Sequence, residues 1–592
     1  MSSEFDNLLI CGGPGTGKTG ILADYATSLI RTSPEHDHRK ILALSFKRHG
    51  ANDIFQRLQK RLTADEVSRF EAFTIDSFAK ELLDRFYHLL PDFWKPSANY
   101  MVDEELFDPL LIKDKFYAAA GTIFPAEDIE AVSPWDFCCN SMTADQLPAE
   151  VIWSGICNID IGFYMWQYFL KQQPSRLDFP MITALAELLI RINPVIKQLL
   201  TATYRSVLLD EFQDVTTVHY QFLRTAFSGI RVIAAGDQNQ NIMRWAHAMP
   251  DNFEAFLQDF DAREVQLNVN IRSALKLLDI QNSVAAELDN TTPLMSAENP
   301  ERTPGVCRAL LFSSDEEESK FIAQEVEKLL SSQISLREIC IIVRDTPEAY
   351  VKMWNSYMDD KNFRFRDEST IQRLFTEPAV QLLLALWENA FADGTDDLLI
   401  SYLTAVNDMS GEDAQNLLDS FTKELQQRFG AENIPPEKLP GLLEDSVKFL
   451  DGSNLKALYP RYRQGVWLEK TLSELQSLMR RNPAGEKSLS QLAVNFRNGS
   501  FIPVATIQQC KFFEAHTVFF TGWEDQEQWG YESDENEELC GFLTAISRAK
   551  EQLFFTAAME RWKEDTTIDR IQKIYKILKN NGISIQLVKP EE

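Results

Sequence analysis

The sequence predicts an α/β protein whose buried strands end in polar residues. Short apolar runs of strand length occur at Asn7–Cys11, Ile41–Ser45 and Arg231–Ala235. A further run at Glu338–Arg344 is apolar within, is bounded by charges, and has a length that suits a strand of a parallel sheet. A glycine-rich loop follows the first run, and two carboxylates follow the run Val207–Leu209. These observations predict an α/β class, with the chemistry at the strand ends.

Length and composition limit the classes of protein to which the chain can belong. Its 592 residues are too many for one hydrophobic core and predict three or four domains. A hydrophobic fraction of 44% is typical of globular proteins, and no apolar run is long enough to cross a bilayer. The N-terminus lacks the basic start and apolar core of a signal peptide, so we expect a cytoplasmic protein without membrane partners.

Cysteine content argues against two kinds of metal site, and net charge limits how the chain can bind nucleic acid. The eight cysteines are scattered and form no CxxC pair, which predicts reduced thiols and neither a zinc ribbon nor an iron–sulfur cluster. The formal net charge is −29, which disfavours non-specific binding of nucleic acid by the whole surface. Any nucleic-acid groove must therefore be local, and we expect its binding to be weak and sensitive to salt.

The loop after the first strand predicts a site for a nucleoside triphosphate. It fits the pattern G-x-x-x-x-G-K-[ST] between a strand and a helix, with the residues Gly12, Gly13, Pro14, Gly15, Thr16, Gly17, Lys18 and Thr19. Glycines let backbone N–H groups surround phosphates, the lysine reaches the β- and γ-phosphates, and the threonine hydroxyl binds Mg²⁺. The alternative, a plain glycine-rich turn before a helix, does not explain the Lys18-Thr19 pair.

Two consecutive carboxylates end a later strand. Asp210 and Glu211 follow the apolar run Val207–Leu209. At such a strand end one carboxylate can hold Mg²⁺ while the other positions or activates the attacking water. Taken alone, the pair fits a solvated surface turn better than a catalytic site, because loops lie at the surface. The phosphate loop and the next apolar strand, which ends in Gly236-Asp237, favour the catalytic interpretation.

Three further strand ends carry candidates for nucleic-acid binding. Phe46 and Lys47 could stack a base and contact phosphate, but a core phenylalanine beside a solvated basic helix fits as well. The hydroxyls of Thr74 and Ser77 suit either phosphate contacts or the capping of a helix, and the residues alone favour capping. Trp245 follows an amide-rich segment and is either a stacking side chain or a buried one.

Six motifs occur in an order that resembles superfamily 1 helicases of the UvrD/Rep/PcrA type. They are GGPGTGKT, LDEFQD, GDQNQNIMRW, Leu267–Ser273, Thr506-Ile507 with Lys511 and Glu514, and Ala545–Lys550. Leu177-Asp178-Phe179 and Gln221 are supporting matches. The resemblance extends from the first strand to about residue 560. It implies two RecA-like P-loop NTPase cores that clamp ATP between them, each with a mainly helical insertion.

This resemblance implies a division of the chain into four parts. Residues 1–88 and 200–268 would form the first core, and residues 89–199 its helical insertion. Residues 269–370 and 500–592 would form the second core, and residues 371–499 a reduced helical insertion.

The resemblance also implies a role for each residue of the nucleotide site, with ATP and Mg²⁺ as cofactors. Thr19 and Asp210 would bind the metal, Glu211 would act as general base, and Gln240 would couple the γ-phosphate to the DNA side. Arg272 and Arg548 would serve as arginine fingers, and Glu514 would contact the nucleotide. Charge neutralisation by such arginines contributes about 10³–10⁵ in rate.

Several positions depart from the pattern of the family. No glutamine precedes Gln56, and Ile271 replaces the aromatic residue that stacks on the base, so we expect weak discrimination between ATP and other triphosphates. Asp76 replaces a histidine and places negative charge where a phosphate would pass. Met243 replaces a stacking tyrosine before Trp245. A stacked base contributes about 1–3 kcal/mol, so these changes predict a weakened DNA track.

We therefore expect a nucleic-acid-dependent ATPase and helicase-like translocase, moving 3′ to 5′ by family resemblance, on single-stranded or partly duplex DNA. The alternative is an ATPase subunit that senses DNA ends and regulates a partner nuclease without processive unwinding. Shortened helicases of this type resemble subunits of bacterial antiviral defence systems such as Gabija.

Three smaller features complete the expectations. Ser314 is predicted to cap a helix that begins with an acidic run. The acidic segment from Glu524 to Glu538 is predicted to be an exposed loop. The aromatic and basic residues between Tyr459 and Trp467 form either a partner surface or, as we favour, a packing face.

Overall fold

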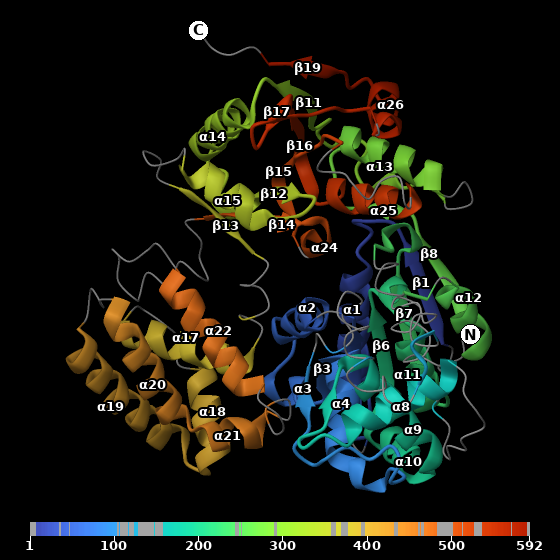
Figure 1. The fold of residues 1–592 in the computed structure, drawn as a ribbon, viewed down its shortest axis with the longest axis vertical. Helices are drawn as coiled ribbons and strands as arrows, with labels where there is room; N and C mark the ends of the chain where they lie inside the picture. Colours follow the sequence, from blue (N-terminus) through green and yellow to red (C-terminus); the bar gives the residue numbers. More distant parts are fainter. Residues whose placement is uncertain are drawn as a thin grey trace. The chain divides into compact units, whose positions relative to one another are not determined.

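The computed structural model describes most of the chain and shows two compact units (Figure 1). The described residues are 7–34, 37–46, 48–103, 106, 117, 124–127, 147, 158–242, 248–249, 251–288, 293–356, 363–368, 374, 377–391, 397–430, 436–459, 462, 467–481, 501–511, 513–525, 535–569 and 571–588. The first unit gathers Met1–Gly12, Gly17–Leu267 and Tyr459–Trp467, and the second gathers Gly13–Thr16, Asn268–Leu458 and Leu468–Glu592.

A six-stranded parallel sheet forms the centre of the first unit, in the order β3-β2-β6-β7-β1-β8. Its strands are β1 (Leu8–Gly12), β2 (Lys40–Ser45), β3 (Phe70–Thr74), β6 (Tyr204–Asp210), β7 (Arg231–Gly236) and β8 (Arg263–Leu267). The predicted α/β class is confirmed. Because the strands are parallel, the carboxyl ends of β1, β6 and β7 meet at one edge of the sheet, and the site residues follow those ends.

Helices cover both faces of this sheet, and successive strand residues point to opposite faces. Leu208 packs into one core with α1 (Lys18–Thr32) and α2 (Arg48–Gln59). Its neighbours Val207 and Leu209 pack into the other core with α4 (Ile75–Phe86), α8 (Asn158–Leu170), α9 (Phe179–Ile192), α10 (Pro194–Thr203) and α11 (Thr217–Phe227). Burial on both sides explains why these strands read as continuous apolar runs. The unit also contains α3 (Ala64–Val67), α12 (Asn252–Asp259) and the short strands β4 (Met101–Val102) and β5 (Arg176–Leu177).

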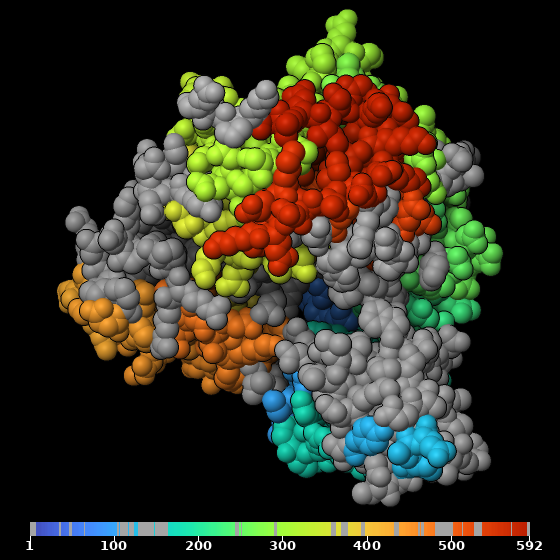
Figure 2. All heavy atoms as spheres, turned by 45° about the horizontal axis from the view of Figure 1, so that its top comes forward, coloured from blue at the N-terminus to red at the C-terminus, as the bar shows by residue number. Residues whose placement is uncertain are grey.

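The second unit contains a seven-stranded parallel sheet in the order β13-β14-β12-β15-β16-β11-β19. Its strands are β11 (Val306–Phe312), β12 (Ile339–Val343), β13 (Arg364–Asp367), β14 (Phe501–Thr506), β15 (Ala515–Thr521), β16 (Ala549–Ala558) and β19 (Ile585–Leu587). The helices are α13 (Leu275–Leu288), α14 (Asp315–Ser331), α15 (Pro347–Ser356), α24 (Ile507–Cys510), α25 (Glu535–Ile546) and α26 (Gln572–Asn580). Figure 2 shows the C-terminal segments in red at the surface, where the edge strand β19 is exposed.

A group of helices lies between β13 and β14 in the sequence. It comprises α17 (Pro378–Phe391), α18 (Asp397–Asn407), α19 (Gly411–Phe429), α20 (Leu439–Leu450), α21 (Gly452–Leu458) and α22 (Trp467–Arg481). The buried Trp387 donates from Nε1 to Ser446 Oγ at 3.0 Å and ties α17 to α20. Tyr462 is fully buried, and Trp467 packs edge-on against Phe179 with ring centroids 6.2 Å apart. Both contacts agree with the packing face that we favoured for this segment.

The acidic segment from Glu524 to Glu538 corrects one expectation, because it is not an exposed loop at either end. Glu524 is fully buried and pairs with Arg561, which also binds Glu318 at 2.8 Å. Glu538 lies in α25, is buried, and forms an ion pair with Arg344. An arginine partner offsets much of the cost of burying a charged carboxylate, and these partners lie too far away in the sequence to be recognised. Residues 526–534 lie outside the described residues.

Two simpler expectations have clear outcomes. Ser314 caps α14, with its Oγ accepting from the backbone N–H of Glu317 at 3.3 Å, so that prediction is confirmed. Among the described residues, no single helix is long and apolar enough to cross a membrane. The consecutive helices α9 and α10 are long and apolar enough for a membrane span only when they are counted together, and the angle between them is 99°.

Candidate active site

The phosphate loop connects β1 to α1, as its pattern predicts. The Lys18 ammonium donates to the Gly12 carbonyl at 2.7 Å, and the Thr16 hydroxyl donates to the Gly13 carbonyl at 2.8 Å. Gly17 precedes the helix with a φ of 84°, a conformation that favours glycine. The first turn of α1 contains no acidic residue, so its N–H groups and dipole remain suited to an anion. This local structure is that of a phosphate cradle.

Asp210 and Thr19 lie together at the carboxyl edge of the first sheet. The Thr19 hydroxyl donates to Asp210 Oδ2 at 3.0 Å, although 191 positions separate the two residues. Asp210 is only 3% exposed, and burial together with the negative charge of Glu211 raises its pKa. A carboxylate destabilised in this way gains from a divalent cation, and both side chains offer the hard oxygen ligands that Mg²⁺ prefers. The donor set therefore fits the predicted metal.

Glu211 departs from the strand in a conformation that is rare for glutamate. Its φ is 53° and its ψ is 44°, in the left-handed region. Its backbone N–H donates to Asp210 Oδ1 at 3.1 Å, and its carboxylate accepts a hydrogen bond from Gln213 Nε2. Thr19 contacts the Asp210 carboxylate and Gln213 contacts the Glu211 carboxylate, so the two carboxylates have different partners and can serve different roles.

Gln213 connects Glu211 to the end of the neighbouring strand. Its Oε1 accepts from the backbone N–H of Asp237 at 3.0 Å. Asp237 in turn accepts from Gln240 Nε2 at 2.6 Å and from the backbone N–H of Asn239 at 3.1 Å. Burial raises the pKa of Asp237. A continuous chain of hydrogen bonds thus runs from Glu211 to Gln240, which is 6% exposed.

A glycine makes room for this chain. A Cβ atom at Gly236 would lie 2.8 Å from Gln213 Oε1 and 2.7 Å from the ring of Phe253. Both distances are shorter than real Cβ contacts, so a larger residue would displace Gln213 from its place beside Asp237.

Asn270 organises the start of the second unit, to which the tip of the phosphate loop belongs. Its Oδ1 accepts from the backbone N–H groups of Arg272 at 2.9 Å and Ser273 at 2.8 Å. Its Nδ2 donates to the Pro14 carbonyl at 2.9 Å, and the backbone of Ile271 donates to Gly15 at 2.9 Å. The loop tip is therefore held by both side-chain and main-chain bonds.

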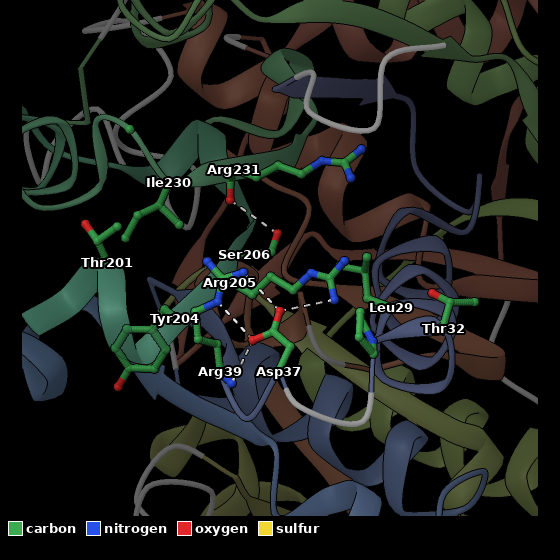
Figure 3. Close-up of a pocket in the computed structure, with 12 residues that line it drawn as sticks. Leu29, Thr32, Asp37, Arg39, Thr201, Tyr204, Arg205, Ser206, Ile230 and Arg231 are labelled. Atoms are coloured by element: carbon green, nitrogen blue, oxygen red, sulfur yellow. Dashed lines mark hydrogen bonds and ion pairs between the residues drawn. The ribbon is translucent and has the colours of Figure 1, made fainter. Parts of the chain in front are cut away.

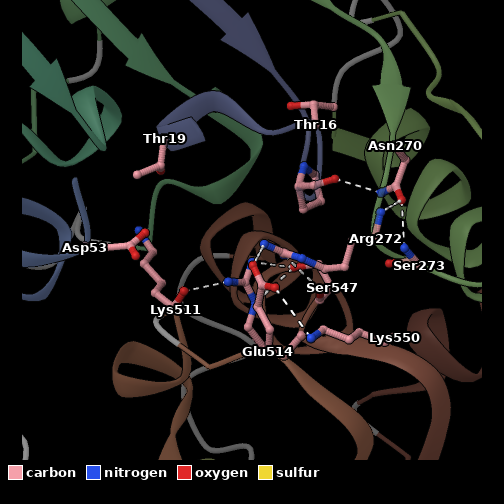
Figure 4. Close-up of polar contacts among 12 residues, drawn as sticks. Thr16, Thr19, Asp53, Asn270, Arg272, Ser273, Lys511, Glu514, Ser547 and Lys550 are labelled. Atoms are coloured by element: carbon pink, nitrogen blue, oxygen red, sulfur yellow. Dashed lines mark hydrogen bonds and ion pairs between the residues drawn. The ribbon is translucent and has the colours of Figure 1, made fainter. Parts of the chain in front are cut away.

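Arg272, Glu514 and Lys550 form a charged group in the second unit (Figure 4). Arg272 pairs with Glu514 and donates from Nη1 to the Ser547 carbonyl at 3.2 Å, while Lys550 lies 3.8 Å from Glu514. Burial acts to raise the pKa of Glu514, but the nearby positive charges outweigh it and hold that pKa below its usual value. Glu514 therefore remains ionised and positions Arg272.

Arg548 lies close to this group but is anchored differently. It is 5% exposed, and its Nη1 donates to the Lys511 carbonyl at 2.6 Å. Its Nε donates to the Thr544 carbonyl at 2.9 Å, and its Nη2 to Ser547 Oγ at 2.7 Å. These acceptors are neutral, and the positive charge of Arg548 also helps to lower the pKa of Glu514.

The structure describes only some of the predicted nucleic-acid ligands. Phe46 is half-buried and packs edge-on against the His219 ring, with centroids 5.7 Å apart. Thr74 and Ser77 form a capping box at the start of α4: Thr74 Oγ1 accepts from the Ser77 N–H at 3.1 Å. Helix capping, which the residues alone favoured, therefore engages both hydroxyls. Lys47 and Trp245 lie outside the described residues.

The carboxylate of Asp76 contacts a histidine, His219. His219 Nε2 lies 2.8 Å from Asp76 Oδ1, and the Thr183 hydroxyl donates to the same oxygen at 3.1 Å. The other ring nitrogen of His219 lies 3.0 Å from Thr216 Oγ1. His219 is 6% exposed and also touches Phe46. Asp76, at the position where the family resemblance implies a histidine, therefore contacts a histidine from a different helix, α11.

Comparison with known proteins assigns this architecture. Residues 2–261 match the model for the UvrD/REP helicase N-terminal domain, and residues 265–421 match the model for the UvrD-like helicase C-terminal domain. The chain belongs to the UvrD-like helicase family.

Relatives of this UvrD-like protein are distant in sequence. DNA helicase II of Haemophilus influenzae is 25% identical over 59% of this chain and 48% of its own length. The Rep helicase of Escherichia coli is 26% identical over 47% of this chain and 41% of its own length. A probable DNA helicase II homolog of Rickettsia felis is 22% identical over 94% of this chain and 90% of its own length. The chain thus spans about half the length of the first of these proteins and less than half of the second.

Sequence reasoning missed the residues that connect the predicted ones. Gln213, Asp237 and Asn270 each lie inside a quoted motif, but no role was assigned to them. His219 lies outside the motifs, and the only signal for it was the unexplained Asp76. The sequence contains seven histidines, and nothing in it indicates which of them contacts Asp76.

Proposed function

We propose that this UvrD-like protein is a nucleic-acid-dependent ATPase and DNA helicase that translocates 3′ to 5′ in the cytoplasm. One observation carries the proposal: the carboxyl edge of the first sheet holds two connected pieces of a hydrolytic site. Thr19 and Asp210 form the pair that fits Mg²⁺. The hydrogen-bond chain from Glu211 to Gln240 provides a route from the attacking water to a sensor of the γ-phosphate.

The proposed chemistry assigns one task to each side chain. Lys18 exchanges its bond to the Gly12 carbonyl for phosphate oxygens. Thr19 and Asp210 hold Mg²⁺, which neutralises charge on the phosphates. Glu211 accepts the proton of the attacking water, and Gln213 keeps its carboxylate in place. Gln240 responds to the γ-phosphate and passes the change to Asp237.

The second unit supplies positive charge in this proposal. Arg272 and Arg548 stabilise the charge that develops on the γ-phosphate, with Arg272 held by Glu514. Ile271 is 50% exposed and presents no aromatic ring to a base. We therefore propose weak discrimination between ATP and other triphosphates, and a comparison of hydrolysis rates for ATP, GTP, CTP and UTP checks it. A strict preference for ATP contradicts this part of the proposal.

We also propose the four-part division predicted from the sequence, with helical insertions at 89–199 and 371–499. Its support lies in the sheet order. Strands β3 and β6 belong to one sheet although the chain between them is long, and β13 pairs directly with β14 across the second interval.

The decisive experiment measures ATP hydrolysis with and without single-stranded DNA. Wild type is expected to be stimulated by DNA, while Lys18→Ala and Glu211→Gln abolish hydrolysis. Glu211→Gln should still bind nucleotide, because only the base is lost. Glu254→Gln, at an exposed position of α12, serves as the matched control. Hydrolysis by Glu211→Gln at the wild-type rate contradicts the assignment of the base.

A second candidate function keeps hydrolysis but removes autonomous unwinding. Its support is the altered DNA track, where capping engages Thr74 and Ser77 and Asp76 replaces a histidine. In this version the chain senses DNA ends and regulates a partner nuclease in an antiviral complex. A strand-displacement assay separates the two functions. Unwinding by the isolated chain supports the helicase, whereas hydrolysis without unwinding supports the regulatory subunit.

A further inference from the structure

The first unit has a pocket lined by arginines and apolar side chains, far from the phosphate loop (Figure 3). It has a volume of about 570 Å³, within the range of about 300–1,000 Å³ that is typical of ligand sites. Its lining comes from the amino ends of β2, β6 and β7 and from the carboxyl ends of α1 and α10. The lining residues are Leu29, Thr32, Pro34, Asp37, Arg39, Thr201, Tyr204, Arg205, Ser206, Gly229, Ile230 and Arg231.

This pocket is separate from the candidate active site because it lies at the opposite edge of the same sheet. Tyr204 begins β6 and lines the pocket, whereas Asp210 ends β6 and faces the phosphate loop. Seven residues of strand at about 3.3 Å each place the two ends about 20 Å apart. A ligand in the pocket therefore cannot be the nucleotide that Asp210 and Thr19 serve.

A single carboxylate fixes two of the three arginines in the pocket. Arg39 binds Asp37 with two parallel bonds, from Nε at 3.0 Å and from Nη2 at 2.9 Å. Arg205 Nη1 lies 3.5 Å from Asp37 and donates to Ser33 Oγ at 2.7 Å. The bonds from Arg39 hold the pKa of Asp37 well below its usual value, so the carboxylate stays charged. Arg69, a further arginine, donates to the Asp37 carbonyl at 2.6 Å and steadies this arrangement.

The pocket retains positive charge after these pairings. A guanidinium has five N–H donors, and the bonds to Asp37 and Ser33 use only some of those on Arg39 and Arg205. Arg231 adds a third guanidinium, which lies 5.1 Å from the Tyr25 ring. The carboxyl ends of α1 and α10 each contribute about half a negative charge. Among the described lining residues, three arginines outweigh one carboxylate and both helix ends, in a chain whose net charge is −29.

The remaining wall of the pocket is apolar. Leu29, Pro34, Ile230 and the ring of Tyr204 line it. Fixed guanidiniums beside an apolar wall suit a ligand that has both a phosphate and a flat ring system, because arginine recognises phosphate oxygens in a fork geometry and also stacks on planar groups. A bare phosphate would leave the apolar wall and most of the volume unused.

We propose that this pocket is a second, non-catalytic site that binds the phosphate of a nucleotide, either free or at the 5′ end of DNA. The arginines Arg39, Arg205 and Arg231 bind the phosphate, and the apolar wall holds the base. Strand β6 joins this pocket directly to Asp210, so occupancy has a short covalent route to the active edge of the sheet. The proposal does not depend on hydrolysis or unwinding.

Equilibrium dialysis with a labelled imido analogue of ATP tests the free nucleotide. Wild type is expected to bind two analogues per chain. Arg205→Gln/Arg231→Gln should bind one, with affinity at the pocket lowered about 10–100-fold by the lost charged hydrogen bonds. Lys18→Ala should also bind one, because it loses the other site. Arg85→Gln, on a side chain that is 62% exposed on α4, is the control and should still bind two.

A second variant, which keeps every charge, distinguishes a blocked pocket from a loss of folding. Thr201→Trp places a large ring in the pocket from the exposed end of α10 and should block the ligand without breaking the bonds of Asp37. Thermal unfolding verifies that each variant is folded. Pocket binding that survives both Thr201→Trp and the double arginine variant overturns the proposal.

A second arm uses DNA and identifies the source of the phosphate. Anisotropy compares a duplex with a 5′-phosphate against the same duplex with a 5′-hydroxyl. A preference for the 5′-phosphate that Thr201→Trp removes, with one analogue bound in dialysis, assigns the site to DNA ends. If two analogues bind and the chain does not prefer the 5′-phosphate duplex, the pocket is a site for free nucleotide. If only one analogue binds and the chain does not prefer the 5′-phosphate duplex, the proposal is overturned. DNA-stimulated hydrolysis tests the proposed function separately.

Discussion

At the scale of single residues, the site depends on how each carboxylate is partnered. Asp210 is buried beside Thr19, whereas Glu211 turns into the left-handed region and binds Gln213. Two neighbouring carboxylates in the same environment would compete for one proton. The reversed backbone at Glu211 gives them different surroundings, which is what separate metal and base roles require.

Gln213 should act as a positioning residue for hydrolysis. Gln213→Leu has a similar size but removes the bonds to Glu211 and Asp237. We expect kcat to fall about 10–100-fold, the loss of a hydrogen bond to a charged group, while the KM for ATP changes less than about twofold. Steady-state hydrolysis measures both. Gln213→Glu, which keeps one acceptor at Asp237 but repels Glu211, should be at least as slow. A purely structural role would instead lower the thermal midpoint and leave kcat unchanged.

Asp178 should make stability depend on pH. Burial raises the pKa of Asp178 to about 7, although it caps α9 by accepting from the Met181 N–H at 2.9 Å. The unfolded value is about 3.9, so the folded state holds the extra proton between about pH 4 and pH 7. Stability from this group is therefore greatest below pH 4, falls as pH rises to about 7, and then levels off.

Asp178→Asn keeps an oxygen that can cap the helix but cannot ionise. We expect the thermal midpoint of wild type to fall more between about pH 5 and pH 8 than that of the variant. Calorimetry at several pH values measures the difference. Asp92→Asn, on a side chain that is 99% exposed, is the control and should follow wild type. Parallel curves for wild type and Asp178→Asn contradict the assignment.

At the scale of elements, the start of α4 shows how one substitution is matched by another. The Thr74 and Ser77 cap holds the helix, and Asp76 points to His219 on α11. The hydrogen bonds to both ring nitrogens fix the imidazole, and its ring supports Phe46. The Asp76 carboxylate is thereby engaged by His219, whose ring also packs against the aromatic side chain of Phe46.

Exchanging the two residues tests this pairing. Asp76→His and His219→Asp are each expected to weaken single-stranded DNA binding and lower the thermal midpoint, because each leaves a buried group without its partner. The double variant should recover part of both losses, with a coupling of about 0.5–3 kcal/mol. Anisotropy and thermal unfolding provide the measurements. The same exchange at Lys328 and Glu325, where the lysine is 68% exposed, should show almost no coupling. Additive losses at Asp76 and His219 refute the pairing.

At the scale of the whole molecule, net charge should limit the DNA binding that we propose. A net charge of −29 repels the backbone phosphates except where basic residues gather. Nucleotide binding is less affected, because the phosphate loop acts at short range with buried partners. Ionic strength should therefore separate the two activities.

We expect salt to weaken DNA binding much more than hydrolysis without DNA. Raising NaCl from about 50 mM to about 200 mM should lower affinity for single-stranded DNA about tenfold or more, because counterions compete for each phosphate contact. Basal hydrolysis should change less than about twofold, since buried pairs are weakly screened. Anisotropy and hydrolysis assays over the same salt series give both quantities. Equal sensitivity of the two would contradict a confined basic track.

The sequence alone determined the α/β class, the phosphate loop and the strand-end carboxylates. These features are local: an apolar run marks a buried strand, and glycine, lysine and threonine at fixed spacing specify a cradle for phosphates. The order of the motifs also identified the helicase family. The structure confirms the predicted strands β1, β2, β7 and β12. They could be recognised because a strand that is buried on both faces has a continuous apolar sequence.

Only the tertiary structure decided which distant side chains meet. Asp76 finds His219 after 143 positions, and Glu524 is buried because Arg561 pairs with it. The basic pocket unites ends of strands and helices from Leu29 to Arg231. The free energy cost of a buried charge depends on the groups that contact it. The fold determines which groups those are, because they often lie far apart in the sequence. The phosphate loop and the strand-end carboxylates could therefore be read from local sequence, whereas the surroundings of Asp76 and the second pocket could not.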